Sequence, residues 1–487
     1  MKQVYFFGAG KADGQSSDSK LLGGKGANLA EMTNIGLPVP PGFTITTECC
    51  IYYLKKKQIP PQLIKDVNEA IIKIEKTMKY QFGGLQSPLL LSIRSGARQS
   101  MPGMMETVLN VGLTSKTIPG LIQLFQDEQF VYDAYRRLIM MYADVVMEKS
   151  EGIIVKRGEL SIRQELELIL EDLKNKHHIK EDSELSVEQL KTLCLLFKKK
   201  IKLKLGTAFP DNPKKQLWGA IEAVFKSWNG KRAIHYRKIE NIPNHWGTAV
   251  NVQAMVFGNL GKKSGTGVAF TRNPSTGVNK FYGEWLINAQ GEDVVAGIRT
   301  PNPINNHSKN KESSNLPSLE SKFPKVYSKL IKIKNILENH FGDMQDIEFT
   351  FQNNNLWMLQ TRKGKRNGHA ALKISMDMLN KNLISEAEAI NRVSTKNLEE
   401  IMHPMINPKD EKNHSILASG LPAGPGGACG QIVLDADSAE ILNNQGYPVI
   451  LIRNETSPED IHGMHAAQGI LTAKGGMTSH AALVARG

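Results

Sequence analysis

The sequence predicts a mixed α+β and α/β protein of several domains. The chain has 487 residues and 40% hydrophobic content, which is enough for about three domains with large cores. Charge-rich helical patterns dominate residues 121–242, whereas apolar runs with strand character precede and follow this region. From Val449 onward the elements follow a β-α-β-α order, which is typical of a small α/β domain.

The charge distribution argues against nucleic acid as a partner. The net charge is +13, but the lysines are scattered, and even their densest runs, 55–57 and 198–200, have no interleaved aromatic residues. Such lysines fit solvated helix faces, together with cations that meet an anionic ligand.

The sequence also predicts a cytoplasmic chain that does not enter a membrane. No stretch approaches the roughly 18 apolar residues of a membrane helix, and residues 1–8 resemble neither a secretory signal nor a transit peptide. The cysteines are few and lack metal-ligand spacing: Cys49, Cys50, Cys194 and Cys429. We therefore expect reduced thiols.

The first candidate ligand contact is a glycine-rich turn within Leu21–Met32 that runs into a helix. Glycines let the backbone approach a ligand closely, and Lys25 adds a positive charge. An ordinary surface turn before a helix fits the pattern equally well. The phosphate-binding P-loop and the dinucleotide-binding glycine fingerprint are both absent from the sequence, so a bound nucleotide would need another mode.

A buried strand, Pro88–Arg94, ends on a charged residue. It leads into a loop of Ser, Gly and Pro that contains Arg98, Gly103 and Met104. Guanidinium groups bind phosphate in a bidentate manner, so arginines at a strand end suit phosphate recognition. Surface salt-bridging is the plainer alternative.

The helical region offers no chemistry, and we expect it to be an insertion. Its clearest amphipathic helices lie at 164–174, 187–202 and 215–238. Strand character returns at Ala249–Phe257 and Tyr282–Ile287.

A hairpin at Asp346–Arg362 is the most informative stretch in the middle of the chain. A three-residue loop, Asn353–Asn355, keeps apolar residues on one face. That register pairs Phe351 with Trp357 and Phe349 with Leu359. On the other face it pairs Glu348 with Gln360 and Asp346 with Arg362. Carboxylate and amide oxygens suit Mg²⁺ held together with phosphates, and Arg362 would meet a phosphate. A surface hairpin with ordinary cross-strand pairs remains the alternative.

The C-terminal stretch contains the candidate nucleophile. A polar helical linker at His369–His403 precedes the small α/β domain. After the predicted strand Gly469–Ala473, two glycines break the chain, and Thr478 and Ser479 are helix-start residues. His480 then lies in the first helical turn, where free N–H groups favour an anion. His480 would then be a nucleophile that becomes phosphorylated. The simpler alternative is a histidine that only packs or caps the helix.

Six long motifs together resemble the pyruvate, phosphate dikinase family over the whole chain. They are GGKGANLAEM around Lys25, SIRSGARQSMPGMMETVLN around Arg94, SGTGVAFTRNPSTG at 264–277, INAQGEDVVAGIRTP at 287–301, DIEFTFQNNNLWMLQTRKGKR at 346–366 and TSPEDIHGMHAAQGILTAKGGMTSHAALVARG at 456–487. The resemblance implies an ATP-grasp nucleotide-binding region at 1–366 with the helical insertion at 121–242. It further implies a linker at 367–415 and a swivelling phosphohistidine domain at 416–487.

The resemblance also implies site residues and a reaction. ATP would be contacted by Lys25, Arg94, Asp346, Glu348, Gln360 and Arg362, with Glu348 and Gln360 near Mg²⁺ and the Gly103–Met104 loop closing over the phosphates. His480, flanked by Thr478 and Ser479, would attack the β-phosphate and release AMP. Inorganic phosphate would take the outer phosphoryl group as pyrophosphate. The remaining phosphohistidine would convert pyruvate to phosphoenolpyruvate.

Members of this family continue beyond the histidine motif and add a barrel that binds pyruvate and phosphoenolpyruvate. On this resemblance we expect a phosphohistidine domain that is incomplete at its C-terminus, and at most the ATP and phosphate half of the reaction. A homodimer is expected only of a full-length form. The alternatives are a related pyruvate, water dikinase, and a non-catalytic phosphocarrier fragment.

Overall fold

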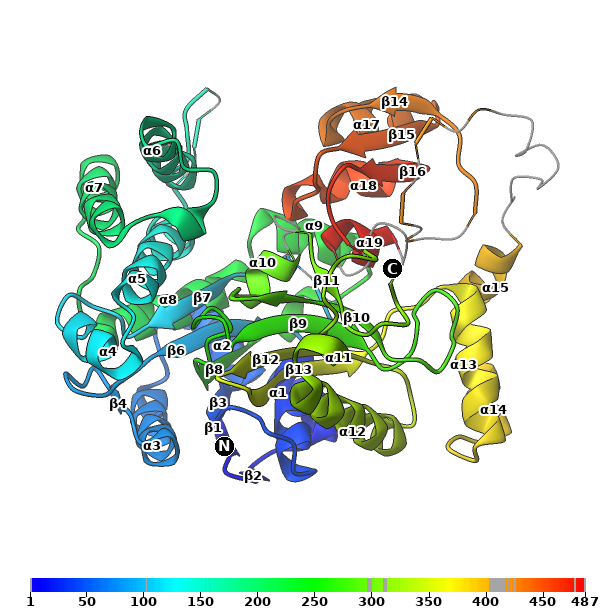
Figure 1. The fold of residues 1–487 in the computed structure, drawn as a ribbon, viewed down its shortest axis with the longest axis horizontal. Coiled ribbons are helices and arrows are strands. Elements are labelled where there is room, and N and C mark those ends of the chain that lie inside the picture. The colour runs from blue at the N-terminus through cyan, green and yellow to red at the C-terminus, as the bar shows by residue number, and fades with distance from the viewer. Residues whose placement is uncertain are drawn as a thin grey trace. The chain divides into compact units, whose positions relative to one another are not determined.

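Two large antiparallel sheets, one in each of two units, organise the described part of the chain (Figure 1). The structure is a computed structural model. It describes residues 2–101, 103–153, 155–156, 158–295, 300–309, 313–402, 415, 417–418, 420–421, 423, 426–476 and 479–485. The units are Met1–Val256 and Phe257–Gly487.

The first unit is built on a six-stranded sheet in the order β2-β1-β3-β8-β6-β7. Its strands are β1 (Val4–Gly8), β2 (Lys11–Ala12), β3 (Gly42–Ile45), β6 (Leu91–Gly96), β7 (Thr107–Val111) and β8 (Ala249–Ala254). A two-stranded pair lies beside it, β4 (Gln81–Phe82) and β5 (Pro88–Leu89). Because β8 pairs with both β3 and β6, residues about 150 to 210 positions apart in sequence become neighbours.

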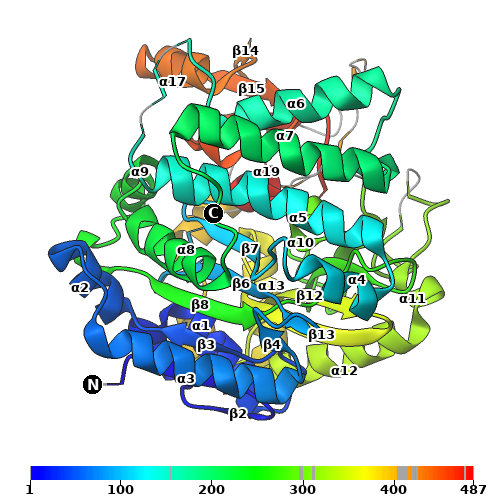
Figure 2. The ribbon, with the colours of Figure 1, turned by 90° about the vertical axis from the view of Figure 1, so that its left-hand side faces the viewer.

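Helices cover this sheet and extend away from it (Figure 2). They are α1 (Ser19–Asn34), α2 (Thr47–Lys56), α3 (Pro61–Met78), α4 (Ile118–Phe125), α5 (Glu128–Tyr142), α6 (Ile162–Lys176), α7 (Val187–Leu205), α8 (Pro213–Ser227) and α9 (Lys231–Ile239), with a π-helical turn at Ala143–Lys149. Helix α7 packs on both α5 and α6. Ser161 and Ser186 start α6 and α7 with reciprocal capping boxes.

The predicted helical region is confirmed, with one correction. The helices expected at 164–174 and 187–202 lie inside α6 and α7. The helix expected at 215–238 is instead two helices, because the chain turns at Trp228–Gly230 and Gly230 becomes the N-cap of α9. The amphipathic pattern continues through this turn, so periodicity alone did not reveal it.

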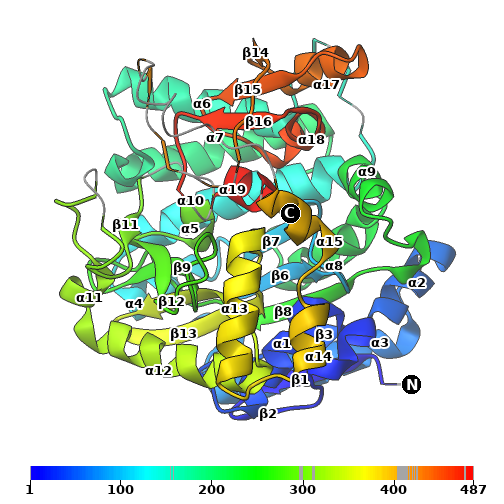
Figure 3. The ribbon, with the colours of Figure 1, turned by 90° about the vertical axis from the view of Figure 1, so that its right-hand side faces the viewer.

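The second unit is built on a five-stranded sheet in the order β11-β10-β9-β12-β13. Its strands are β9 (Gly265–Phe270), β10 (Tyr282–Ile287), β11 (Asn302–Pro303), β12 (Gln345–Gln352) and β13 (Asn355–Lys363). Its helices are α10 (Gly291–Val295), α11 (Leu319–Lys322), α12 (Pro324–Phe341), α13 (Gly368–Asn380), α14 (Glu386–Asn391) and α15 (Thr395–Ile401). Figure 3 shows α13, which packs against α14 and α15. Three aromatic rings, of Trp285, Phe323 and Phe351, form part of the core.

The second unit also contains a three-stranded parallel sheet, β14-β15-β16. Its elements alternate along the chain: β14 (Gln431–Val433), α17 (Ala436–Asn444), β15 (Val449–Arg453), α18 (Ile461–Ala466), β16 (Gly469–Thr472) and α19 (His480–Ala485). The β-α-β-α order predicted from Val449 onward is confirmed, and β14 and α17 precede it. Val433, Val449 and Leu451 form a core with Ala439 and Met464.

The structure describes the state of the cysteines and the apolar character of the helices. The four cysteines are free thiols, and three of them are buried. Among the residues that the structure describes, none of the helices combines the length and the apolar character needed to cross a membrane.

Candidate functional site

The glycine-rich turn of the first unit packs directly on the end of β6. Gly23 has a φ of 67°, and a Cβ atom there would lie 1.8 Å from the carbonyl oxygen of Gly96. The amide N–H of Gly24 donates to the carbonyl oxygen of Ala97 at 2.8 Å. A Cβ atom on Gly96 would lie 3.7 Å from the Cβ of Lys25. The turn therefore holds Lys25 against the strand that carries Arg94.

Arg94 is half-buried on β6, two residues before Gly96. Its Nη2 donates to Oε1 of Gln253 at 2.5 Å. The structure thus brings Lys25 and Arg94 to the same end of one strand, as expected for cations that share an anionic ligand.

Arg98, the second arginine of this stretch, has a different environment. Its guanidinium lies 5.2 Å from the ring centroid of Trp246, which is a cation–π contact. Burial lowers the pKa of the Arg98 guanidinium. Its contact with Trp246 gives Arg98 a packing role in this unit.

The loop between β6 and β7 turns its methionines inward. Met104 is 2% exposed and its N–H donates to the carbonyl oxygen of Met101. Gly103 is exposed with a φ of 71°, and Glu106 pairs with Arg232 of α9 at 2.8 Å. The ion pair anchors the loop to α9; closure of Gly103 and Met104 over phosphates stays a prediction.

Polar side chains buried on β8 were not expected from the sequence. Asn251 and Gln253 are 0% and 1% exposed. Asn251 Oδ1 accepts from Thr44 Oγ1 at 2.8 Å, and its Nδ2 has no hydrogen-bond partner among the described residues. The sequence did contain a signal for this polar face, because Asn and Gln alternate with Val within the strand. Polar residues at every second position of a strand lie on the same face of the sheet.

In the second unit, the predicted polar pairs of the hairpin are confirmed. Strands β12 and β13 place Glu348 opposite Gln360 and Asp346 opposite Arg362. Nε of Arg362 donates to Oδ2 of Asp346 at 2.7 Å, and Asp346 is only 3% exposed. One face of the hairpin therefore carries two carboxylates, an amide and a guanidinium.

The predicted loop of this hairpin is wrong. The turn has two residues, Asn353 and Asn354, with φ values of 48° and 64°, which suits a type I′ turn. The apolar pairs are Phe349 with Met358 and Phe351 with Leu356, instead of the predicted Leu359 and Trp357. A β-bulge inserts Leu359 and restores the predicted register for the polar pairs.

Glu284 of β10 belongs to the same sheet face and was also missed. The register across four strands forms one row: Glu284, Val268, Glu348 and Gln360. A Cβ atom on Gly476 would lie 2.3 Å from Oε1 of Glu284, so the Gly476 backbone packs against this carboxylate. A lone Glu within the apolar strand Tyr282–Ile287 was the only sequence signal.

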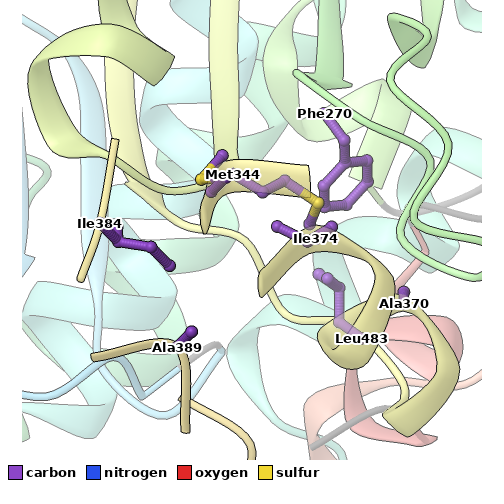
Figure 4. Packing of buried hydrophobic residues seen from close by; sticks show 8 residues of the cluster. Phe270, Met344, Ala370, Ile374, Ile384, Ala389 and Leu483 are labelled. Atoms are coloured by element: carbon purple, nitrogen blue, oxygen red, sulfur yellow. The ribbon is translucent and has the colours of Figure 1, made fainter. Parts of the chain in front are cut away.

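Helix α19 begins at His480, as predicted. Ser479 acts at its start, because its Oγ accepts from the N–H of Ala482 at 3.4 Å. Figure 4 shows Leu483 of this helix packed in a cluster with Phe270, Ala370 and Ile374. Thr478 and the side chain of His480 lie outside the described residues.

The oxygen donors of the hairpin suit a hard cation that also binds a substrate. Within the described residues there is no group of three or more His, Cys, Asp or Glu side chains arranged as a metal cage. Glu348 and Gln360 provide one carboxylate and one amide oxygen from directly opposed positions. Mg²⁺ commonly uses one or two protein carboxylates and completes its shell with phosphates and water, so this donor set fits it.

Two known families match parts of the chain. The family described as "Pyruvate phosphate dikinase, AMP/ATP-binding domain" matches residues 19–64, 54–329 and 324–383. The family described as "PEP-utilising enzyme, mobile domain" matches residues 446–487.

Individual relatives match the chain along its whole length. Pyruvate, phosphate dikinase of Rhizobium meliloti (strain 1021) is 53% identical over 487 residues, which is 100% of this chain and 53% of the relative. The enzyme of Clostridium symbiosum is 49% identical and covered to 53%, and the chloroplastic enzyme of Flaveria pringlei is 49% identical and covered to 48%. The chain spans about half the length of these curated relatives.

Proposed function

The chain belongs to the pyruvate phosphate dikinase AMP/ATP-binding family, and on this premise we propose that it binds ATP with Mg²⁺ and phosphorylates its own His480. This is the ATP and phosphate half of a dikinase reaction. The observation that carries the proposal is the hairpin face on which Asp346 pairs with Arg362 directly beside the Glu348 and Gln360 pair.

The site residues divide into four roles. Lys25, Arg94 and Arg362 bind phosphate oxygens, because cations neutralise the charge of a triphosphate. Glu348 and Gln360 hold Mg²⁺, which when bound offsets the charge that develops on the transferred phosphoryl group. Asp346 orients Arg362 through the 2.7 Å hydrogen bond, and the Gly103–Met104 loop covers the phosphates.

We propose the following division of the chain. Residues 1–366 form an ATP-grasp region with the helical insertion 121–242, residues 367–415 form a linker, and residues 416–487 form part of a swivelling phosphohistidine domain. One histidine that serves two separate sites needs such a moving carrier.

In the proposed reaction, a bond forms between an imidazole nitrogen of His480 and the β-phosphorus of ATP. The bond from that phosphorus to the bridging oxygen of the α-phosphate breaks, and AMP leaves with the oxygen. Ser479 caps the start of the helix that presents His480, and Thr478 precedes it in the sequence. Inorganic phosphate removes the outer phosphoryl group as pyrophosphate, and pyruvate accepts the remaining one in the complete dikinase reaction.

Labelled ATP tests this half-reaction. With Mg²⁺ and without inorganic phosphate, label in either the β- or the γ-phosphate becomes bound to the protein, whereas label in the α-phosphate does not. Added phosphate then releases the γ-label as pyrophosphate and leaves the β-label. The His480→Ala variant takes up no label, while His462→Ala, a matched histidine variant of the same C-terminal sheet region, behaves as the original chain.

Other outcomes would identify the alternatives. Release of the γ-label as orthophosphate without any acceptor phosphate would indicate a water dikinase. A folded chain that takes up no label at all would indicate a non-catalytic phosphocarrier fragment.

A further inference from the structure

Gln253 holds the Arg94 guanidinium through a fully buried amide. The side chain is 1% exposed on β8. Its Nε2 donates to the carbonyl oxygen of Pro40 at 3.0 Å, and its Oε1 accepts from Nη2 of Arg94 at 2.5 Å. Because the first bond fixes which end of the amide is the oxygen, the second has one possible orientation.

The sheet register makes this contact specific. Strands β6 and β8 are antiparallel, with Arg94 opposite Asn251 and Ser92 opposite Gln253. Gln253 is therefore the diagonal neighbour of Arg94 on the adjacent strand, at about 7–8 Å between backbones, a separation that two long side chains can span. The other diagonal neighbour on β8, Ala249, has no polar side chain.

We propose that Gln253 is a positioning residue that fixes the Arg94 guanidinium for the nucleotide phosphates. This inference rests on the proposed function of Arg94 in ATP binding. A neutral amide oxygen orients a guanidinium by one hydrogen bond, whereas a carboxylate in the same place would also neutralise it and compete with phosphate.

A second buried glutamine shows what a purely structural role looks like here. Gln216 on α8 is 0% exposed, and among the described residues its amide bonds backbone groups alone: the N–H of Gly112 and the carbonyl oxygens of Leu113 and Pro210. Gln253 differs because one of its partners is a cationic side chain proposed to bind the ligand. Gln216 therefore serves as the matched control.

The test is a double-mutant cycle on ATP binding, measured by calorimetry with Mg²⁺ on the 487-residue chain. Arg94→Met raises the Kd for ATP by about a hundredfold, and Gln253→Met raises it by about tenfold, as expected for loss of a hydrogen bond to a charged group. Gln253→Met has no additional effect in the Arg94→Met background. The Kd for adenosine, which lacks phosphates, changes by less than about twofold.

The control separates positioning from general destabilisation. Gln216→Met lowers the unfolding temperature at least as much as Gln253→Met but leaves the Kd for ATP unchanged. If Gln253→Met does not fold, Gln253→Glu replaces it. There the carboxylate compensates the charge of Arg94, and the Kd for ATP rises by at least about tenfold.

The outcomes distinguish this inference from the proposed function. If Arg94→Met weakens ATP binding but the Gln253 variants bind ATP as the original chain does, the positioning role is wrong. Equal losses for Gln253→Met with and without Arg94 would also overturn it. If Arg94→Met itself binds ATP normally, the proposed role of Arg94 is wrong, and this inference falls with it.

Discussion

Arg94 and Arg362 are proposed to bind phosphate, yet the two units hold them by opposite means. Arg94 donates to a neutral amide, that of Gln253. Arg362 donates to a carboxylate, that of Asp346, which is 3% exposed. An amide positions a cation and leaves its charge available, whereas a carboxylate positions it more strongly and offsets part of the charge. The comparison shows that the first unit positions its arginine with a neutral acceptor, whereas the second positions its arginine with a charged one.

The two arginines also depend on different kinds of geometry. Arg94 needs a diagonal side-chain contact between β6 and β8, whereas Arg362 needs the register of a hairpin that contains a bulge. Each dependence can be broken separately.

The largest effect is expected from moving the register beyond the bulge. Deleting Thr361 shifts either Gln360 or Arg362 out of its pair, because only one residue then separates the bulge from Arg362. We expect the Kd for ATP to rise about a thousandfold, or about 4 kcal/mol. Calorimetry with ATP and Mg²⁺ measures it.

Deleting Leu359 is the matched control, since the inserted residue is lost and both polar pairs remain opposed. Here the Kd for ATP should stay within about threefold. A large loss on deletion of Leu359 would show that the bulge itself contacts the ligand.

The next effect concerns a second arginine held by a carboxylate. Asp343 is 5% exposed and pairs with Arg366, with Nη2 to Oδ2 at 3.0 Å. Asp343→Asn should lower the unfolding free energy at pH 7 by about 3 kcal/mol, because it removes one partner of a buried pair. Urea unfolding measures it.

The same pair should make stability depend on pH in the acid range. Burial raises the pKa of Asp343, but hydrogen bonding and charge from Arg366 outweigh burial and hold the pKa below its usual range. The pair therefore stabilises above the unfolded pKa of about 3.9 and loses this contribution as the pH falls through the lower folded pKa. The difference between the original chain and Asp343→Asn should shrink below about pH 4; a constant difference down to pH 2 would contradict the assignment.

A smaller effect is expected on the unfolding free energy when either of the two arginines proposed to bind phosphate is replaced. Arg362→Met leaves a buried carboxylate without its arginine and should cost about 2 kcal/mol of unfolding free energy. Arg94→Met removes the donor from the buried amide oxygen of Gln253 and should cost about 1 kcal/mol. Urea unfolding of both variants under one set of conditions gives the ratio, and a larger cost for Arg94→Met would reverse the comparison.

The smallest effect is expected at the hairpin turn. Asn354 has a φ of 64°, which glycine adopts without strain, so Asn354→Gly should change the unfolding free energy by less than about 0.5 kcal/mol. Unchanged ATP affinity in this variant would show that the bulge, and not the identity of the turn residue, aligns Arg362 with Asp346.

The sequence predicted those parts of the fold and site that depend on local pattern. Strands Tyr282–Ile287 and Val449–Arg453 have their predicted bounds because turn residues limit short apolar runs. The polar hairpin pairs followed from alternation. The apolar pairs did not, because Phe349 and Phe351 can face either Trp357 and Leu359 or Leu356 and Met358, and alternation does not reveal an inserted residue.

The contacts that were missed depend on neighbours far apart in sequence. The role of Gln253 depends on β8 lying beside β6, about 160 residues earlier in the chain. The position of Glu284 depends on β9 lying between β10 and β12. Side chains of this kind read as isolated polar residues until strand order is known.

The bulge at Leu359 also has a consequence for how this hairpin tolerates changes in length. Loss of one turn asparagine would convert the turn and bulge into an unbulged hairpin. Trp357 and Leu359 would then pair with Phe351 and Phe349 in the core, in place of Leu356 and Met358. Glu348 would still face Gln360, and Asp346 would still face Arg362. The tip of the hairpin can therefore gain or lose a residue by insertion or deletion while the strand register at the ligand-binding end stays the same.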